Sequence, residues 1–195
     1  MPSTIAILHA SRFGQAEKIA HVVAAELSAR GFSAPVTSLA AALSSQEEGH
    51  HPIPAWATSK GKVAGVVLIA SIRYGHFAPE LESFIEANKT WLANVPTAFA
   101  SVSLTARKPE KNTPQTHPYT RRFLQRMHRR GWHPETVAVF AGALRYPRYG
   151  WLDKAMIRLI MRITGGETNP STNSEYTDWK AVRCWAHAIA AQAGL

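Results

Sequence analysis

The sequence predicts an α/β domain built on a doubly wound, five-stranded parallel sheet. Five short apolar segments have the character of buried strands, and segments with helical periodicity alternate with them. Apolar runs without polar alternation are typical of strands that are covered on both faces. The chain has 195 residues, of which 46% are hydrophobic and 18% charged, enough to bury the core of one such domain. We therefore expect residues 1–195 to form a single domain.

The first half of the chain is expected to contain three strands. A strand from Thr4 to His9 leads through a polar turn into a helix that starts at Gln15 and ends near Gly31, where glycine favours a helix C-terminus. Residues 32–39 are a plausible second strand, and residues 44–61 are expected to form a weak helix followed by a loop. Residues 63–70 are the most apolar segment and are expected at the centre of the sheet.

The second half continues the alternation. Pro79 is expected to open a helix that extends through Trp91, since proline is favoured in a first helical turn. Strands are predicted over residues 95–103 and 136–142, and a basic helix over residues 119–130. A closing helix over residues 178–193 is expected to begin at Thr177. No apolar run reaches the roughly 18 residues of a membrane-spanning helix.

Two long segments exceed this minimal scheme. Residues 104–118 form a polar, basic connection, and residues 143–175 are an insertion between the last strand and the closing helix. Loops of this length in a compact domain are usually functional or disordered. We expect both to be functional.

The charge balance favours an anionic partner. Lys and Arg number 22 against 13 Asp and Glu, a net charge of +9, which suits nucleic acid, an acidic lipid surface or a carboxylate-bearing ligand without choosing among them. The single cysteine, Cys184, excludes an intramolecular disulfide and is expected to be a buried or half-buried thiol. The histidines show no metal-ligand spacing, so no metal is expected. No secretory signal is evident, and we expect the protein inside the cell.

Three loops leave strands at the edge where parallel sheets bind ligands. In the first, Ser11 offers a hydroxyl and Gly14 a tight turn before a helix N-terminus that could bind an anion. An ordinary helix cap is the alternative. The second, SIRYGHF at 71–77, offers an aromatic ring, a glycine and polar groups for a flat heterocycle, although Tyr74 and His76 could equally be a packed ring and a surface histidine. The third follows Val102.

Several uncommon strings in the same order give a more specific indication. The segment from Ser11 to Gln15, SIRYGHF at 71–77, ARKPEKNTPQT at 106–116, AGALRYPRY at 141–149 and GGET at 165–168 together resemble the bacterial menaquinone-dependent protoporphyrinogen oxidases. The resemblance implies a flavodoxin-like sheet with strand order 2-1-3-4-5 and FMN as cofactor. It also implies a role in haem biosynthesis, with electrons passing from protoporphyrinogen IX through FMN to a membrane quinone, either menaquinone or ubiquinone.

The same resemblance implies which residues hold FMN. The phosphate would be bound by the first loop and the flavin ring by the second and third loops. The implied residues are Ser11, Arg12, Phe13, Gly14, Gln15, Ala16, Ser71, Ile72, Arg73, Tyr74, Gly75, His76, Val102, Ser103 and Leu104. Ala16 departs from the family pattern, because flavodoxin-like phosphate loops commonly carry a threonine there, and its hydroxyl is a donor worth about 0.5–1.5 kcal/mol.

The start of the insertion combines guanidinium groups with aromatic rings. Arg145, Tyr146 and Arg148 suit the propionates and macrocycle of a porphyrinogen, although such a composition also suits a nucleic-acid backbone. Arg107, Lys108 and Lys111 form a second cationic group, expected to be a solvated loop. Neither the catalytic residues nor the proton acceptor can be assigned, with Tyr74 and His76 as candidates because they follow the central strand.

The segment from Trp151 to Ile163 has an amphipathic helical pattern. Its apolar residues share one side, and Lys154, Arg158 and Arg162 recur every four residues on the other. Such a helix could lie in a membrane interface and give access to a quinone, or it could pack on the protein's own sheet. We expect peripheral binding to the cytoplasmic side of the inner membrane. A soluble flavodoxin-type electron carrier, another FMN-dependent quinone reductase and a nucleic-acid-binding module are the alternatives, of which we expect nucleic acid not to be a partner.

Overall fold

The computed structural model describes residues 2–47, 63–145, 155, 162 and 173–194. A central sheet runs in the order β2-β1-β3-β5-β6, and each neighbouring pair is parallel. This is the order 2-1-3-4-5 expected for a flavodoxin-like fold, so the predicted fold class is confirmed. The strands are β1 (Thr4–Ala10), β2 (Val36–Ser38), β3 (Val63–Arg73), β5 (Thr97–Ser103) and β6 (Thr136–Ala141).

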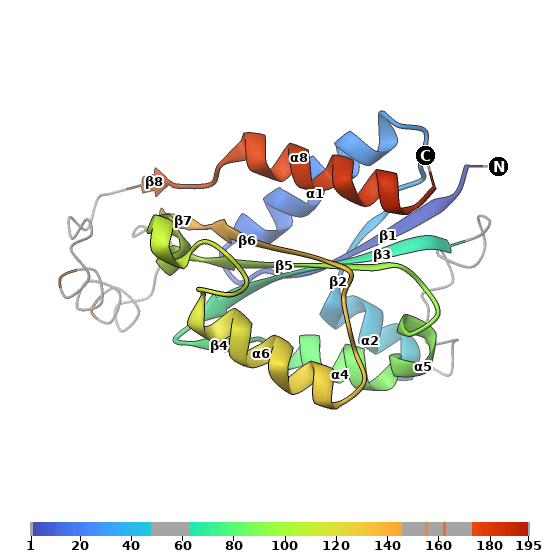
Figure 1. Ribbon diagram of the computed structural model, residues 1–195, viewed down its shortest axis with the longest axis horizontal. Helices are drawn as coiled ribbons and strands as arrows, with labels where there is room; N and C mark the ends of the chain where they lie inside the picture. Colours follow the sequence, from blue (N-terminus) through green and yellow to red (C-terminus); the bar gives the residue numbers. More distant parts are fainter. Residues whose placement is uncertain (1, 48–62, 146–154, 156–161, 163–172, 195) are drawn as a thin grey trace.

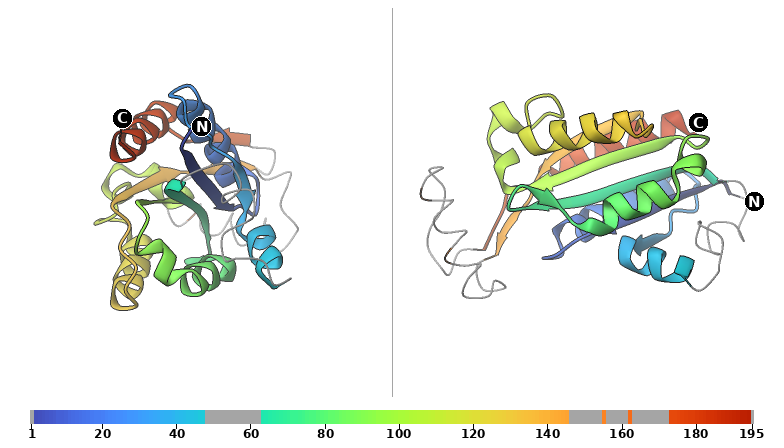
Figure 2. Two further views of the ribbon diagram at one scale, coloured as in Figure 1. Left: turned by 90° about the vertical axis from the view of Figure 1, so that its right-hand side faces the viewer. Right: turned by 90° about the horizontal axis from the view of Figure 1, so that it is seen from below.

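Helices cover both faces of the sheet and make three layers (Figures 1 and 2). One face carries α1 (Gln15–Ser28) and α8 (Trp179–Gln192). The other carries α2 (Leu39–Glu47), α4 (Pro79–Ala87), α5 (Lys89–Leu92) and α6 (Pro118–Arg129). β1 begins and α8 ends at the same end of the molecule, opposite the carboxyl edge of the sheet (Figure 1).

Alternation along the strands divides the apolar residues between two cores. Ile5 and Ile7 of β1 pack into the core under α1 and α8, whereas Ala6 and Leu8 pack into the core on the other face. Successive side chains of a strand point to opposite faces, so an uninterrupted apolar run supplies both cores at once. The continuous apolar segments in the sequence are therefore strands with helices on both sides.

Several element boundaries differ from the prediction. The second strand is only Val36–Ser38, and α2 begins at Leu39, earlier than expected. The helix from Pro79 breaks at Asn88, whose side-chain amide donates a 2.8 Å hydrogen bond to the carbonyl of Phe84 and ends α4. The cap of α8 is Asp178, which accepts from the amide of Ala181, so the prediction of Thr177 as the start was wrong.

Cys184 also departs from expectation. It lies on the outer side of α8 and is exposed, not buried or half-buried. The helical pattern of the sequence did not show that Cys184 lies on the opposite side of the helix from Val182 and Trp185, which face the sheet.

The long connection after β5 is more ordered than a plain loop. It contains two 3-10 turns, η1 (Leu104–Arg107) and η2 (Pro109–Lys111), before α6 begins. The insertion begins and ends with the strands of a small antiparallel pair, β7 (Ala143–Arg145) and β8 (Asn173–Glu175). None of the helices in the described part of the chain has the length and apolar character needed to span a bilayer.

Some predicted residues fall outside the described residues. Tyr146 and Arg148 lie there, as does the segment from Trp151 to Ile163 except Ala155 and Arg162, which are both helical and exposed. Arg145 is placed by its backbone as the last residue of β7.

Candidate functional site

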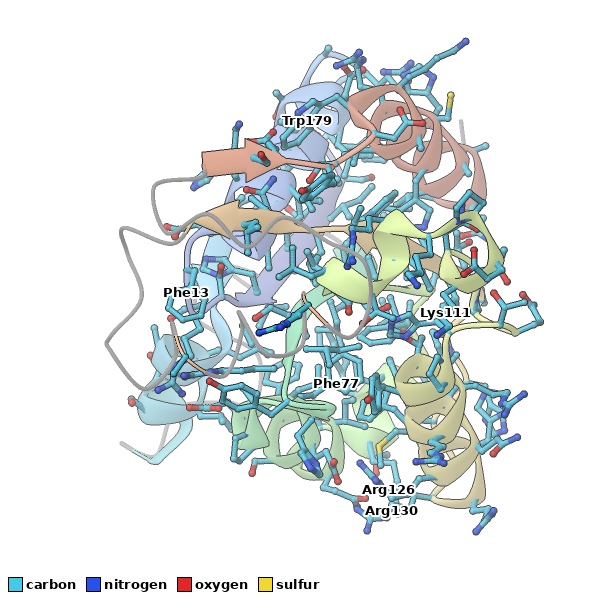
Figure 3. The ribbon with its side chains drawn as sticks, turned by 90° about the vertical axis from the view of Figure 1, so that its left-hand side faces the viewer. Phe13, Phe77, Lys111, Arg126, Arg130 and Trp179 are labelled. Atoms are coloured by element: carbon cyan, nitrogen blue, oxygen red, sulfur yellow. The ribbon has the colours of Figure 1, made fainter. Side chains whose placement is uncertain are left out.

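A cavity of about 460 Å³ opens at the carboxyl edge of the sheet, between the segments that follow β1, β3, β5 and β6. Its volume lies within the range of small-molecule sites. Figure 3 looks onto this edge of the molecule, with Phe13 on one side of the face and Lys111 on the other. The three loops singled out in the sequence thus meet at one site, because the carboxyl ends of parallel strands share one edge.

Most of the residues expected to hold a cofactor line this cavity. They are Ser11, Arg12, Phe13, Gln15, Ser71, Ile72, Arg73, Tyr74, Gly75, Val102, Ser103 and Leu104. Gly14, Ala16 and His76 do not line it. Ala16 is fully buried in the core beneath α1, and Gly14 forms the turn that starts the helix.

The β1 end of the cavity provides hydrogen-bond donors. The hydroxyl oxygen of Ser11 is buried, and no hydrogen-bond partner for it exists among the described residues. Gly14, at φ 86°, is the N-cap of α1 and leaves the first amides of the helix without a side-chain cap. Amides at a helix N-terminus, beside a hydroxyl, are suited to binding a phosphate.

Gln15 is fixed by a contact from the far end of the chain. Its side-chain amide donates to the Thr177 hydroxyl at 2.8 Å, and that hydroxyl donates to the carbonyl of Ala141 at 2.7 Å. Nearby, the Lys18 ammonium pairs with the Glu175 carboxylate at 2.9 Å. These contacts join the start of α1 to the end of β8 and the residues just before α8, and so hold the turn that follows β1.

The second wall is a tight hairpin. Ser71, Ile72 and Arg73 belong to β3 itself, and Arg73 pairs with His76 of β4 (His76–Phe77). The two residues between them, Tyr74 and Gly75, both have positive φ, 49° and 84°, as a two-residue hairpin turn requires. The turn leaves the Tyr74 ring 47% exposed at the cavity.

Gly75 is also required by a close neighbour. A Cβ at this position would lie 2.7 Å from the ring of Tyr119, which lines the cavity from the start of α6. Tyr119 was not among the expected site residues. Its place was hidden in the sequence because it lies in a predicted helix, and only the packing of the hairpin against that helix brings its ring to the cavity.

Arg73 connects the hairpin to the loop that follows β1. Its guanidinium lies over the ring of Phe13, 5.4 Å from the centroid, and over that of Tyr74 at 4.7 Å. It also donates to the Tyr74 hydroxyl at 3.3 Å. Stacking of a guanidinium between two rings fixes the position of both aromatic side chains.

The third wall is the η1–η2 segment. The Ser103 hydroxyl accepts from the amide of Thr105 at 3.1 Å, and the Arg107 guanidinium donates to the carbonyl of Leu104 at 3.1 Å. Lys108 and Lys111 follow, both partly buried and both lining the cavity. The cationic group expected to be a solvated loop is thus a wall of the site.

The electrostatics of the cavity are one-sided. Arg12, Arg73, Arg107, Lys108 and Lys111 line it, whereas the described residues that line it include no aspartate or glutamate. Such a concentration of one sign of charge favours anionic ligands and raises their rate of association.

A buried polar cluster supports the base of α6. His117 is fully buried and its Nδ1 accepts from the amide of Thr120 at 3.3 Å, which makes His117 the N-cap of the helix. The Thr120 hydroxyl lies 2.8 Å from the same nitrogen and 2.7 Å from the Ser101 hydroxyl. Burial, with a smaller contribution from Lys111, lowers the pKa of His117 below its ordinary value.

A second cavity of about 710 Å³ adjoins the first, on the side of β2 and β4. It shares Ser11, Arg12, Ser71, Arg73 and Tyr74 with the first cavity, and it contains His76. Gly142 and Ala143, after β6, complete the first cavity and were also missed. Their apolar character offered no chemical signal in the sequence.

Together these walls suit a flat ligand with an anionic end. Ser11 and the start of α1 offer donors to a phosphate, and the rings of Tyr74, Phe13 and Tyr119 offer surfaces to an aromatic body. The residues present therefore fit the FMN that the sequence resemblance implies. Backbone amides can serve where Ala16 replaces the usual threonine.

Comparisons of the sequence with known proteins agree on one family. The model of the flavodoxin domain matches residues 6–171. The chain is 44% identical over 186 residues to protoporphyrinogen IX dehydrogenase (quinone) of Escherichia coli strain K12. The alignment covers 94% of this chain and 93% of that protein. It is 49% identical over 126 residues to the protein of the same name from Leishmania major, covering 65% of this chain and 53% of that one.

Solved structures with the same fold are more distant in sequence. Rubredoxin oxygen:oxidoreductase from Desulfovibrio gigas superposes with a TM-score of 0.55 at 12% identity, over 98% of this chain and 36% of that one. A flavo di-iron protein from Thermotoga maritima superposes with a TM-score of 0.53 at 8% identity, over 99% of this chain and 36% of that one. This chain thus spans about a third of the length of these two proteins, and the likeness concerns the fold.

Proposed function

This chain belongs to the flavodoxin domain family, and we propose that it oxidises protoporphyrinogen IX through bound FMN, with a quinone as the electron acceptor. The chain is an oxidoreductase, in agreement with the name of relatives that match over nearly its whole length. Within this proposal, residues 1–195 form one domain in which residues 143–175 are an insertion after β6. The product, protoporphyrin IX, is a precursor of haem.

The observation that carries the proposal is the convergence of the three loops on one cavity with an anion-binding end. Ser11, Gln15 and the first amides of α1 would hold the FMN phosphate. The hairpin at Tyr74 and Gly75 and the segment from Val102 to Leu104 would hold the flavin ring on opposite sides. These two segments follow β3 and β5, which are neighbours in the sheet.

FMN, when bound, supplies the redox chemistry, because it can accept a hydride from a donor and pass the electrons to a quinone. The chain positions the reactants. Apolar surfaces of Phe13, Tyr74 and Tyr119 exclude water from the faces of aromatic ligands, and the cationic rim attracts the carboxylates of the substrate. Tyr74 is the candidate for hydrogen bonding to the substrate's departing proton, since it lines the cavity while His76 does not.

The proposal is tested in two stages. Purified protein is first titrated with FMN, and quenching of flavin fluorescence is expected to reach saturation at one FMN per chain. The loaded protein is then mixed anaerobically with protoporphyrinogen IX, which should bleach the flavin absorbance, and a quinone should restore it while protoporphyrin fluorescence grows. A protein that binds FMN but is reduced only by a protein donor would instead be an electron carrier.

Membrane contact is a separate part of the proposal. The amphipathic pattern from Trp151 to Ile163, with Lys154, Arg158 and Arg162 on its polar side, favours peripheral binding to anionic lipid at the cytoplasmic side of the inner membrane. β7 and β8, the first and last strands of the insertion, lie at the same edge of the sheet as the cavity (Figure 1). This contact would bring the flavin site close to a membrane-dissolved quinone.

Vesicles test the membrane contact. We expect the full chain to sediment with vesicles that contain anionic lipid and to remain in the supernatant with neutral ones. Deletion of residues 151–163 should abolish sedimentation and turnover with a membrane-embedded quinone, while FMN binding and turnover with a water-soluble quinone persist. Unchanged turnover with the embedded quinone would contradict this role.

A further inference from the structure

We infer that Lys108 and Lys111 form a clamp for the two propionate carboxylates of the porphyrinogen, at the side of the cavity opposite the phosphate loop. The inference rests on the proposed function and assigns the substrate's anionic edge to the η1–η2 segment. It departs from the expectation that Arg145, Tyr146 and Arg148 make this contact.

The first support is the spacing of the two lysines. Lys108 caps η2 and Lys111 is its last residue, and the amide of Lys111 donates to the carbonyl of Lys108 at 2.9 Å. The two lysines stand at the two ends of this one short turn, and both line the cavity. Their ammonium groups can therefore contact two carboxylates of one ligand at once.

The second support is that these cations are not committed within the protein. Both lysines are partly buried at the cavity wall. In the described part of the chain, no ion pair or side-chain hydrogen bond joins either one to another residue. Arg73 and Arg107, in contrast, contact Tyr74 and the carbonyl of Leu104. A partly buried ammonium without a carboxylate is well placed to bind an anionic ligand.

The third support is the rigidity of the segment. The bond from Thr105 to the Ser103 hydroxyl holds its start, and the amide of Lys108 donates to the carbonyl of Thr105 at 3.2 Å. At its end, the amide of His117 donates to the carbonyl of Thr113 at 2.8 Å. The backbone that carries the lysines is therefore ordered before a ligand arrives, which lowers the entropy lost on binding.

The position of the clamp separates it from the phosphate of FMN. Ser11 and the start of α1 follow β1, whereas the η1–η2 segment follows β5, two strands away in the sheet order. Figure 3 shows Phe13, two residues after Ser11 in the chain, and Lys111 on opposite sides of the face. One cavity thus has two anion-binding ends, and FMN has a single phosphate.

The chemistry of the substrate fits the second end. Protoporphyrinogen IX carries its two propionates on neighbouring pyrroles, so both carboxylates leave the same edge of the macrocycle. Two ammonium groups from one turn match that edge, and the uncharged opposite edge can then face the apolar part of the cavity. The clamp would fix which edge of the macrocycle approaches the flavin.

The test uses Lys108→Gln, Lys111→Gln and the double variant, with Lys89→Gln as matched control. Lys89 is an exposed lysine of α5, at the far end of the molecule from the cavity (Figure 1). We expect each single substitution to raise KM for protoporphyrinogen IX roughly tenfold, as expected for loss of one charged hydrogen bond. FMN affinity and KM for quinone should match those of the wild type, as should all values for the control.

A substrate without carboxylates provides the second comparison. The dimethyl ester of protoporphyrinogen IX should be a poor substrate for the wild type, with KM raised as far as in the double variant on the free acid. The lysine substitutions should leave KM for the ester unchanged, because the interaction they remove is already absent. An equal loss on acid and ester would overturn the clamp.

Binding of the product separates the clamp from the proposed function. Protoporphyrin IX binding, followed by its fluorescence, should weaken roughly tenfold in each variant but not in the control. If the wild type oxidises protoporphyrinogen IX and the variants have the same KM and porphyrin affinity, the clamp alone is overturned. If FMN binding weakens in the variants, the lysines bind the cofactor and not the substrate. Wild-type protein that neither oxidises porphyrinogen nor binds porphyrin overturns both proposals.

Discussion

The side-chain amide of Gln15 donates a 2.8 Å hydrogen bond to the hydroxyl of Thr177, between residues that lie 162 positions apart in the sequence. Gln15 is the first residue of α1 and lines the cavity. Thr177 lies just before α8, and its hydroxyl donates a hydrogen bond to the carbonyl of Ala141 at the end of β6. The turn after β1 is therefore held in place by the segment that follows the insertion.

Replacement of Thr177 by valine keeps the shape of the side chain and removes the hydroxyl. The Gln15 amide and the Ala141 carbonyl lose a buried partner, so we expect the free energy of unfolding to fall by about 1–3 kcal/mol. FMN affinity should fall as well, because the turn is less firmly held. Denaturant unfolding and FMN titration measure the two effects. Thr177→Ser, which keeps the hydroxyl, should stay close to the wild type in both.

Replacement of Ser11 by alanine tests the phosphate site. The Ser11 hydroxyl is buried without a partner among the described residues, so its loss should leave the stability of the FMN-free protein unchanged or slightly higher. A hydrogen bond to a charged group is worth about 1.5–3 kcal/mol, and we expect FMN to bind at least about tenfold more weakly. Riboflavin, which has no phosphate, should bind both proteins equally, and an equal loss for both ligands would place the phosphate elsewhere.

Replacement of Gly75 by alanine tests the contact with Tyr119. The new Cβ would lie 2.7 Å from the Tyr119 ring, and the φ of 84° is unfavourable for alanine. Gly31 is a matched control, because its φ is 87° but nothing lies within 4 Å of a Cβ there. We expect Gly31→Ala to cost about 1–2 kcal/mol from the backbone alone, and Gly75→Ala to cost more and to weaken FMN binding.

Denaturant midpoints and FMN titrations of both glycine variants give the comparison. Equal midpoints with unchanged FMN affinity would mean that the Tyr119 ring moves aside without cost, and that the hairpin and α6 are not packed as tightly as the structure indicates.

The buried histidines should make stability fall in acid. The pKa values of His9 and His117 are lowered from 6.5, chiefly by burial, so the unfolded chain binds more protons than the folded one below that pH. The contribution of the two neutral, buried imidazoles to the free energy of unfolding is therefore fully present above about pH 6.5 and is lost as the pH falls through the lowered pKa values.

His117→Asn isolates one of these contributions. Asparagine is a favoured N-cap and can accept from the Thr120 amide as Nδ1 of His117 does, but it does not titrate. We expect the variant to lose less stability than the wild type between about pH 7.5 and 5.5, with His9 responsible for part of the remainder. Urea unfolding at a series of pH values measures this. An unchanged slope would mean that His117 is not buried in its neutral form.

The fold could be predicted from the sequence because its signals are local. Each buried strand is a continuous apolar run, and Gly31 and Pro79 mark a helix end and a helix start. The shortness of β2 was not predictable, because Phe32 packs into the core and extends the apolar pattern beyond the segment that is hydrogen-bonded to β1. The break at Asn88 depends on one side-chain hydrogen bond to the backbone, which periodicity does not report.

Part of the candidate site could likewise be predicted from the sequence, and part could not. The loops after β1, β3 and β5 were predictable from strand ends and composition, together with the family resemblance. Tyr119, Gly142 and Ala143 were not, because they reach the cavity through packing between elements distant in sequence. The place of Lys108 and Lys111 in the cavity wall depends on the 3-10 turns, which are too short to leave a periodic pattern. His76 was expected at the site, but it lines the second cavity and not the first.

The pairing of β7 with β8 makes the insertion a replaceable module. Arg145 faces Asn173 across the two strands, and Leu144 is buried with Phe13, Leu104 and Tyr176 beneath them. Because the two ends are adjacent and anchored, residues 146–172 could be exchanged for a two-residue turn or for the equivalent segment of a relative without moving the sheet. Chimaeras joined at this pair would test whether this segment determines which electron acceptor the flavin reduces.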